Sequence, residues 1–240
     1  MKVCPAFFAL ACLLPASAQG FTGPWSTTIY LQQSWPKQTE ANRQIKQDIN
    51  GAFGTHFQTW DDVANLNVGV QVFRDLSPQW RVGLEFDYSS GRIRGSETVA
   101  TLAGPAIMGF EQKYTTYADL LAVVHYRPLG NTGPWYPFLV AGAGLAYDKD
   151  RTLLTLRNSL LDEHLQVDNS GWFPMLTVGA GADIYLSDAR NWYVEVGVSY
   201  SWARLKHSAD AHGSLASSPT VTADTDSTGP NVWVGFGRRF

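Results

Sequence analysis

Histidines are the first candidates for catalysis, because imidazole is the side chain that most often exchanges protons near neutral pH. His125 stands in an alternating segment and is followed by Tyr126 and Arg127, whereas His207 is followed directly by Ser208. A nucleophilic serine needs a histidine within hydrogen-bond reach and an acid that orients the imidazole. Neither histidine stands in a suitable arrangement, so we predict no catalytic residues and no enzyme activity.

A metal site is the second chemical candidate. Residues with oxygen or nitrogen ligands gather near the C-terminus: His207, Asp210, His212, Asp224 and Asp226. The surrounding residues are small and polar, which is typical of a solvated loop without fixed geometry. The two cysteines are Cys4 and Cys12, so the chain after them offers no thiolate ligand. We therefore predict neither a metal nor another cofactor.

Charged residues on one face of the alternating segments are the third candidate. The set is Arg81, Glu85, Asp87, Asp119, His125, Asp183 and Glu195, to which the same pattern adds Lys113 and Arg127. One interpretation is a polar pore. The alternative, which the mixture of both signs favours, is a network of ion pairs that fills a narrow interior.

A leucine-rich stretch could offer an apolar binding surface. Its members are Leu153, Leu156, Leu160, Leu161 and Leu165, and several of them recur near helical spacing. A helix here would either form a hydrophobic mouth for apolar molecules or pack down as a plug. Residues 39–49 also have a helical pattern, with Thr39 as the cap, and they are polar enough to suggest a surface helix.

The elements that would position these residues are strands, because period-2 alternation dominates the chain. In Trp80–Tyr88 every even position is apolar and every odd position is polar or glycine. Eight strands are expected: 25–33, 66–72, 80–88, 118–126, 136–147, 176–186, 192–202 and 232–240. Short turns are expected at 75–79, 128–134 and 187–191, and long loops at 34–62, 89–112, 148–170 and 203–229.

Alternation alone does not decide which face meets water. The polar face carries nine glycines: Gly69, Gly83, Gly142, Gly144, Gly179, Gly181, Gly197, Gly235 and Gly237. Small residues suit the narrow interior of an eight-stranded barrel. Aromatic residues end several strands, and the chain itself stops at Phe240. We therefore predict an all-β fold, a transmembrane antiparallel β-barrel of eight strands, with a ten-stranded barrel as the alternative.

The composition and the N-terminal residues predict that the chain is exported across the inner membrane. Residues 1–18 contain one lysine, a short apolar run and an Ala-Ser-Ala end, which predicts a signal peptide followed by one barrel domain at 19–240. Charged residues make up only 16% of the chain and the net charge is −3, so nucleic acid is excluded as a partner. The expected location is the outer membrane, with its lipid and lipopolysaccharide as surroundings.

The segment Tyr136–Tyr147 resembles the fifth strand of the OmpW family, and residues 171–200 and 235–240 also resemble small outer-membrane barrels of the OmpW and OmpA type. The resemblance covers roughly residues 80–240 and implies a barrel that passes small hydrophobic molecules or supports envelope integrity. It also implies that Phe240 is recognised by the barrel-assembly machinery. The alternatives are a structural or surface-binding barrel with a closed lumen and, third, a lipid-modifying enzyme.

Overall fold

The computed structural model describes residues 24–36, 39–60, 63, 65–130, 135–186, 190–216 and 219–240. The expected signal peptide, residues 1–18, lies outside these ranges. One helix, α2 (Thr39–Arg43), continues directly into a π-helical segment, η1 (Gln44–Gly51). The strands are β1 (Trp25–Ser34), β2 (Asn65–Asp75), β3 (Trp80–Thr101), β4 (Gly104–Tyr126), β5 (Trp135–Arg157), β6 (Asp162–Tyr185), β7 (Trp192–His212), β8 (Thr220–Asp226) and β9 (Gly229–Arg239).

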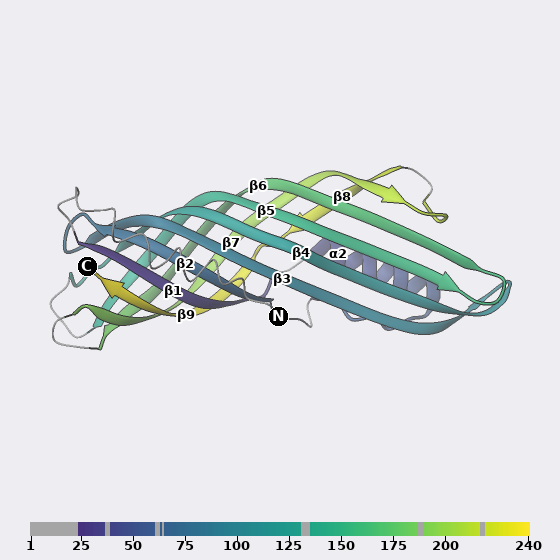
Figure 1. Ribbon diagram of the computed structural model, residues 1–240, viewed down its shortest axis with the longest axis horizontal. Coiled ribbons are helices and arrows are strands. Elements are labelled where there is room, and N and C mark those ends of the chain that lie inside the picture. The colour runs from purple at the N-terminus through teal and green to yellow at the C-terminus, as the bar shows by residue number, and fades with distance from the viewer. Residues whose placement is uncertain are drawn as a thin grey trace.

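Eight of these strands close into one antiparallel ring (Figure 1). Its order is β1, β2, β3, β4, β5, β6, β7 and β9, and β9 returns to pair with β1. The additional strand β8 pairs with the outer part of β7, beyond the stretch of β7 that pairs with β9. The prediction of an eight-stranded barrel is therefore confirmed, and the ten-stranded alternative is wrong.

The two faces of the ring follow the alternation of the sequence. In the first half of β3, Arg81 and Asp87 are buried inside, whereas Trp80, Val82 and Leu84 are exposed on the outer face. The neighbouring strands repeat this parity through the cross-strand register. An apolar outer face around a closed ring is what a bilayer requires, because the ring leaves no strand edge unpaired in lipid.

Aromatic side chains mark both ends of the apolar belt. Near the short turns, Trp80 packs on Tyr126 with ring centroids 4.7 Å apart. Near the opposite end, Tyr147 packs on Trp172 at 5.0 Å. Rows of this kind lie at the two interfaces of a membrane. The end with the short turns is the periplasmic side of such barrels, so we call the other end the outer end.

Glycines make room inside the ring for large side chains from adjacent strands. A Cβ on Gly69 would lie 2.2 Å from the ring of Tyr30, and one on Gly197 would lie 2.2 Å from the ring of Trp233. Such contacts are impossible, so these positions must lack a side chain. Five glycines of the polar face stand against aromatic rings that occupy the interior: Gly69, Gly83, Gly181, Gly197 and Gly237.

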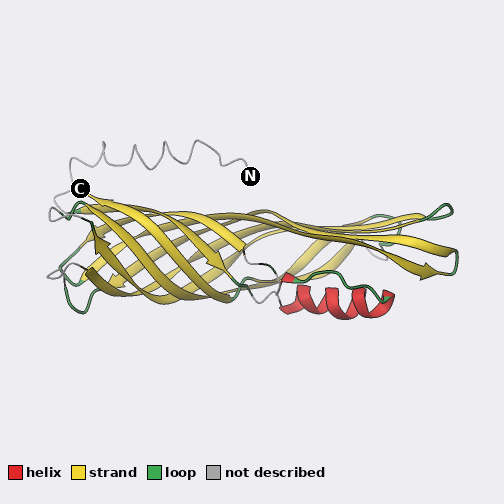
Figure 2. Ribbon diagram, turned by 90° about the horizontal axis from the view of Figure 1, so that it is seen from below, coloured by secondary structure: helices red, strands yellow, loops and turns green. Residues whose placement is uncertain are grey.

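The expected loops 89–112, 148–170 and 203–229 are wrong for most of their length. The strands β3, β4, β5 and β6 run on for 22 to 24 residues each and form a sheet beyond the barrel, which we call the extension (Figure 2). The leucine-rich stretch is accordingly two strands joined by a tight turn, because Leu154 pairs with Leu165 across β5 and β6. Its helical spacing was coincidental.

A bulge in β4 changes which of its side chains face inward. Tyr114–Tyr117 of β4 stand against only Ser89–Gly91 of β3, and Tyr114–Thr116 stand against only Lys149–Asp150 of β5, so the extra residue belongs to β4 in both ladders. An extra residue in one strand moves the following side chains to the opposite face. Lys113 is consequently exposed on the outer surface, and the prediction that it lies inside the lumen is wrong.

The helical segment packs against the concave face of the extension (Figure 2). Ile45 of η1 joins a buried apolar cluster with Phe57, Trp60, Ile93, Val99, Ala106, Met108, Phe110 and Tyr114. The predicted helix at 39–49 is confirmed, but its interpretation as a surface helix is only partly right, because Ile45 is 2% exposed. The described helices include none that is long and apolar enough to cross a membrane.

Candidate functional site

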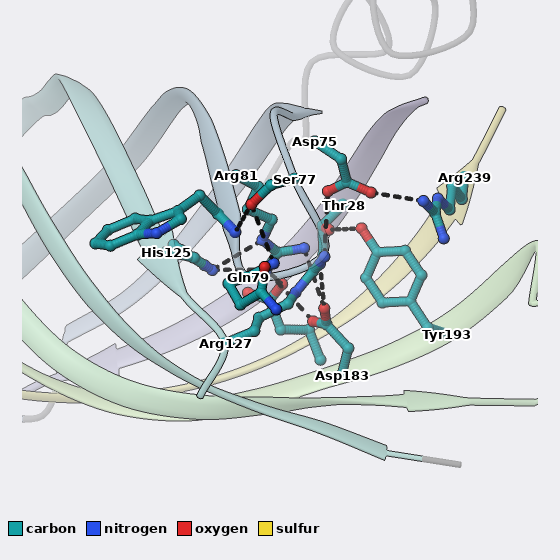
Figure 3. A network of polar contacts seen from close by, with 12 residues as sticks. Thr28, Asp75, Ser77, Gln79, Arg81, His125, Arg127, Asp183, Tyr193 and Arg239 are labelled. Atoms are coloured by element: carbon teal, nitrogen blue, oxygen red, sulfur yellow. Dashed lines mark hydrogen bonds and ion pairs between the residues drawn. The ribbon is translucent and has the colours of Figure 1, made fainter. Parts of the chain in front are cut away.

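In the periplasmic half of the lumen, Arg81 contacts several buried polar side chains (Figure 3). Its guanidinium is fully buried and lies 3.1 Å from a carboxylate oxygen of Asp183 and 2.8 Å from one of Glu195. It also donates to Nδ1 of His125, at 3.0 Å from Nε and 2.7 Å from Nη2. A guanidinium has only donors, so Nδ1 must accept, and the ring proton of His125 belongs on Nε2.

Further ion pairs connect this group to the turns at the periplasmic end. Arg127 lies 2.9 Å from Asp183 and 3.1 Å from Asp75, and Arg239 lies 2.8 Å from the other oxygen of Asp75 (Figure 3). Arginines and carboxylates thus alternate across the mouth, with three of each once Glu195 and Arg81 are included. Each charge at this mouth therefore has a partner of opposite sign, and opening the arrangement would leave buried charges unpaired, which is strongly unfavourable.

Asp75 and Arg239 were not among the predicted site residues. Asp75 was assigned to a turn, and Arg239 stands next to the end of the chain. The alternation itself could have predicted both residues. The odd positions of β2 and β9 face inward, and Asp75 and Arg239 are the next odd positions of these strands.

Aromatic rings surround the charged group. Phe73 and Phe138 lie on either side of it, with ring centroids 4.5 Å and 4.2 Å from that of His125 and 4.2 Å and 5.1 Å from the Arg81 guanidinium. The indole of Trp233 donates to Glu195 at 3.0 Å. These rings exclude water and add cation–π contacts to the ion pairs.

Carboxylates occupy the outer half of the lumen. Glu85, Asp87 and Asp119 all point inside, and Gln71 donates to Glu85 at 2.6 Å. Two cavities are found between the described residues of the lumen, of about 10 Å³ and about 40 Å³. A cavity of this size holds a few water molecules at most.

The predicted leucine mouth is not one surface. Leu156 and Leu165 face the concave side of the extension together with Leu154, whereas Leu153 faces the opposite side. Leu160 is 78% exposed at the tip of the hairpin, and Leu161 follows it in the same turn. The strand pleat separates these side chains, which a helix would have gathered on one face.

A groove lies on the concave side instead. It has a volume of about 290 Å³ and runs between the helical segment, the extension and β8. Its apolar walls come from Ile49 on the helical side, from Leu154, Leu165 and Val167 on the extension, and from Val221 on β8. Asn169 and Thr225 close its barrel end, and the Asn169 amide donates to the Thr225 hydroxyl at 3.1 Å.

Next to this groove the ladder between β6 and β7 is interrupted. The strands pair from Met175 and Ala203 toward the periplasmic end and again at Gln166–Asp168, in the same register. The described backbone shows no ladder pairs between Asn169–Pro174 of β6 and Arg204–Ala209 of β7, a stretch we call the seam. Pro174 has no N–H to donate, and β7 is held along this stretch only on its other edge, where β8 continues the pairing made by β9.

The remaining predicted positions have no assigned role in this geometry. Of the suggested metal ligands, the side chains of His207 and Asp224 lie outside those the structure describes. Among the side chains that are described, no three metal-ligand groups come together. Phe240 follows β9, and its N–H donates to the Trp25 carbonyl at 2.8 Å, so the last residue lies beside the first strand. Its role in assembly stays a prediction.

Comparison with protein-family models and with curated proteins finds no match. Solved structures of outer-membrane proteins do match. OprG from Pseudomonas aeruginosa is 18% identical with a TM-score of 0.46, and the alignment covers 91% of this chain and 96% of OprG. The N-terminal β-barrel domain of Pseudomonas aeruginosa OprF is 11% identical with a TM-score of 0.40, over 91% and 98% of the two chains.

The outer membrane protease OmpT from Escherichia coli is also similar, at 11% identity and a TM-score of 0.38, over 74% of this chain and 63% of that one. Matches at this level concern the fold alone, and one fold serves many activities. The activity must be argued from this chain's own residues.

The closed ring, its apolar belt and its two rows of interfacial aromatic side chains together satisfy what a lipid bilayer demands of a β-structure. The chain is an outer-membrane β-barrel protein of the small eight-stranded kind.

Proposed function

We propose that the protein captures small apolar molecules in the groove at its outer end and releases them sideways into the membrane through the seam. The observation that carries this proposal is the position of the groove, whose barrel end is formed by Asn169, the first residue of the seam. A volume of about 290 Å³ is close to the lower end of the range for small-molecule sites, which begins at roughly 300 Å³.

The filled lumen supports a sideways route over an axial one. A solute that crossed the barrel along its axis would have to break the buried ion pairs of Arg81 and Arg127. Breaking a buried pair is strongly unfavourable, because it leaves charges without partners. At the seam, by contrast, two strands can separate without losing ladder hydrogen bonds. A general porin activity and an enzymatic activity are not part of this proposal.

Filling the groove tests ligand capture. Leu154→Trp places an indole in the groove, and we expect it to weaken binding of a fluorescent apolar probe such as N-phenyl-1-naphthylamine by roughly tenfold or more, since the indole displaces the ligand. The matched control is Leu153→Trp, which adds the same ring to the adjacent residue on the opposite face. Equal binding by both variants would contradict a ligand site in the groove and favour a structural or surface-binding role.

Locking the seam tests release. Ser170 and Ser208 stand opposite one another when the register of the ladder is continued through the seam, and residues 19–240 contain no cysteine that could interfere. A disulfide in Ser170→Cys/Ser208→Cys holds the two Cα atoms within about 7 Å and so keeps the strands together. We expect the oxidised protein to bind the probe normally and to lose its transfer into liposome bilayers, with recovery on reduction.

The control for this lock is Thr177→Cys/Ser201→Cys, a directly opposed pair in the part of the wall that is already hydrogen-bonded. Its oxidation should leave transfer unchanged. Full transfer by the oxidised Ser170→Cys/Ser208→Cys protein would overturn the sideways route while leaving the groove as a binding site.

A further inference from the structure

A group of cations lies on the outward face of the extension, above the outer row of aromatic side chains. Arg92, Lys113 and Arg151 stand directly opposite one another on β3, β4 and β5. Adjacent strands are about 4.8 Å apart, so three positive charges are held within roughly 10 Å. Like charges in opposed positions destabilise a sheet unless an anion lies between them.

Two of these three cations, Arg92 and Arg151, form ion pairs with carboxylates of the protein. Arg92 pairs with Glu111, and Arg151 lies 2.7 Å from Asp168. Partial burial works to raise the pKa of Asp168, but hydrogen bonds from Arg151 and Gln166 outweigh it and lower that pKa below its ordinary value. Asp168 is therefore an anion at neutral pH and compensates Arg151 alone.

Three exposed cations on this face have no ion-pair partner among the described residues: Arg94, Lys113 and Lys149. Lys113 lies between Arg92 and Arg151 in the register, and Lys149 lies two residues nearer the membrane than Arg151. These three cations and the paired Arg92 and Arg151 outnumber the two carboxylates that pair with them, Glu111 and Asp168, by three, and the next carboxylate in the row, Asp210, lies beyond Asp168 on β7. We call Arg92, Arg94, Lys113, Lys149 and Arg151 the cation patch.

A hollow of about 430 Å³ adjoins the patch on the same face. Arg92, Arg94 and Ser96 form one side, Leu153 and Thr155 form the other, and Gly109 and Glu111 lie between them. A Cβ on Gly109 would lie 2.6 Å from the hydroxyl of Thr155, so a larger residue there would fill part of the hollow. The hollow therefore combines two cations, one carboxylate that is paired with Arg92, and hydroxyl and apolar surface.

The distance of the cation patch from the outer aromatic row indicates which kind of anion it meets. Tyr147 of the aromatic row, Lys149 and Arg151 follow one another at two-residue steps on the outward face of β5. At about 3.3 Å per residue, the cations stand roughly 7 and 13 Å along the strand from the aromatic row. This is the level of phosphorylated headgroups, whose acyl chains would lie against the apolar belt directly below.

We propose that the cation patch binds the phosphates of lipid A in the outer leaflet, with the adjoining hollow receiving its sugar. The proposal is independent of the ligand groove, which lies on the opposite, concave face of the same strands. Charge-assisted contacts to phosphate are stronger than neutral hydrogen bonds and give the headgroup a fixed position on the barrel. The bound lipid would also neutralise the cations that the sheet holds together.

The test measures lipid binding to the full chain, purified in a neutral detergent, by native mass spectrometry with added lipid A. We expect Lys113→Gln/Lys149→Gln to lower the apparent affinity by roughly tenfold or more, because two phosphate contacts are lost. The matched control, Arg43→Gln/Arg157→Gln, removes the same number of exposed cations away from the patch and should bind as the wild type does. Heat-modifiable migration on gels checks that each variant is folded.

Two further arms identify the ligand. Lipid A from which both phosphates have been removed should bind far more weakly, and millimolar inorganic phosphate should not compete, because it lacks the acyl chains. Arg94→Gln provides an independent variant if the double substitution fails to fold, and it should weaken binding in the same direction. Equal binding of dephosphorylated lipid A, full competition by free phosphate, or wild-type binding by the patch variants would each overturn the proposal.

Discussion

Replacing Arg81 by alanine should lower the free energy of unfolding by about 3–5 kcal/mol, since this is the usual effect of removing one partner from a buried ion pair. The loss leaves Asp183 and Glu195 side by side inside the ring, with His125 deprived of its donor. Arg127 still pairs with Asp183, but among the described residues it forms no ion pair with Glu195. Urea unfolding in lipid vesicles, followed by the gel shift of the folded barrel, measures the difference.

An exposed ion pair gives the control for this result. Arg157→Ala removes a cation that lies 2.8 Å from Asp162 at the tip of the extension, and its effect should be below about 1 kcal/mol. A second variant, Arg81→Met with Asp183→Asn and Glu195→Gln, removes the charges together and should recover much of the lost stability. A small effect of Arg81→Ala would mean that water reaches this part of the lumen.

Placing arginine at Val196 should lower the free energy of unfolding by about 2–4 kcal/mol, because a charged side chain near the bilayer midplane loses its hydration. Val196 is on the outer face of β7, opposite Ala182 on one neighbour and Val234 on the other. The same urea titration measures the effect, and reconstitution into lipid is essential because detergent adapts to a charge more easily.

The matched control is Ser208→Arg, on the same face of β7 but beyond the aromatic row. There the added charge meets water and headgroups, so the expected change is about 0–1 kcal/mol. Equal tolerance at the two positions would show that the apolar face of β7 does not meet lipid.

Much of the barrel was predictable because alternation depends on local geometry. A strand presents successive side chains to opposite faces, so Arg81, Asp87, His125, Asp183 and Glu195 were placed inside from their parity alone. Their contacts were not predictable. They come from strands far apart in the sequence, and only the closure of the ring brings Arg81 of β3 to Glu195 of β7.

The outer end was mostly beyond sequence reasoning. A bulge in β4 shifts its register against both neighbours, so the period-2 pattern of this strand is broken where the strand in fact continues. The same effect turned Lys113 from an expected lumen residue into part of the cation patch. The alternation within one strand cannot predict a bulge, because a bulge is defined by two residues of one strand standing opposite one residue of its partner.

The sequence by itself determined a barrel with its polar face inward, because alternation depends on each residue and its nearest neighbours, whereas export of residues 19–240 stays a prediction. The tertiary structure alone decided the extension, the groove under the helical segment and the interrupted seam between β6 and β7. Each of these features arises where segments distant in the chain meet, and the leucines at 153–165 show the difference. Their spacing suggested one helical face, and the pairing of β5 with β6 distributes them over two sides of a sheet.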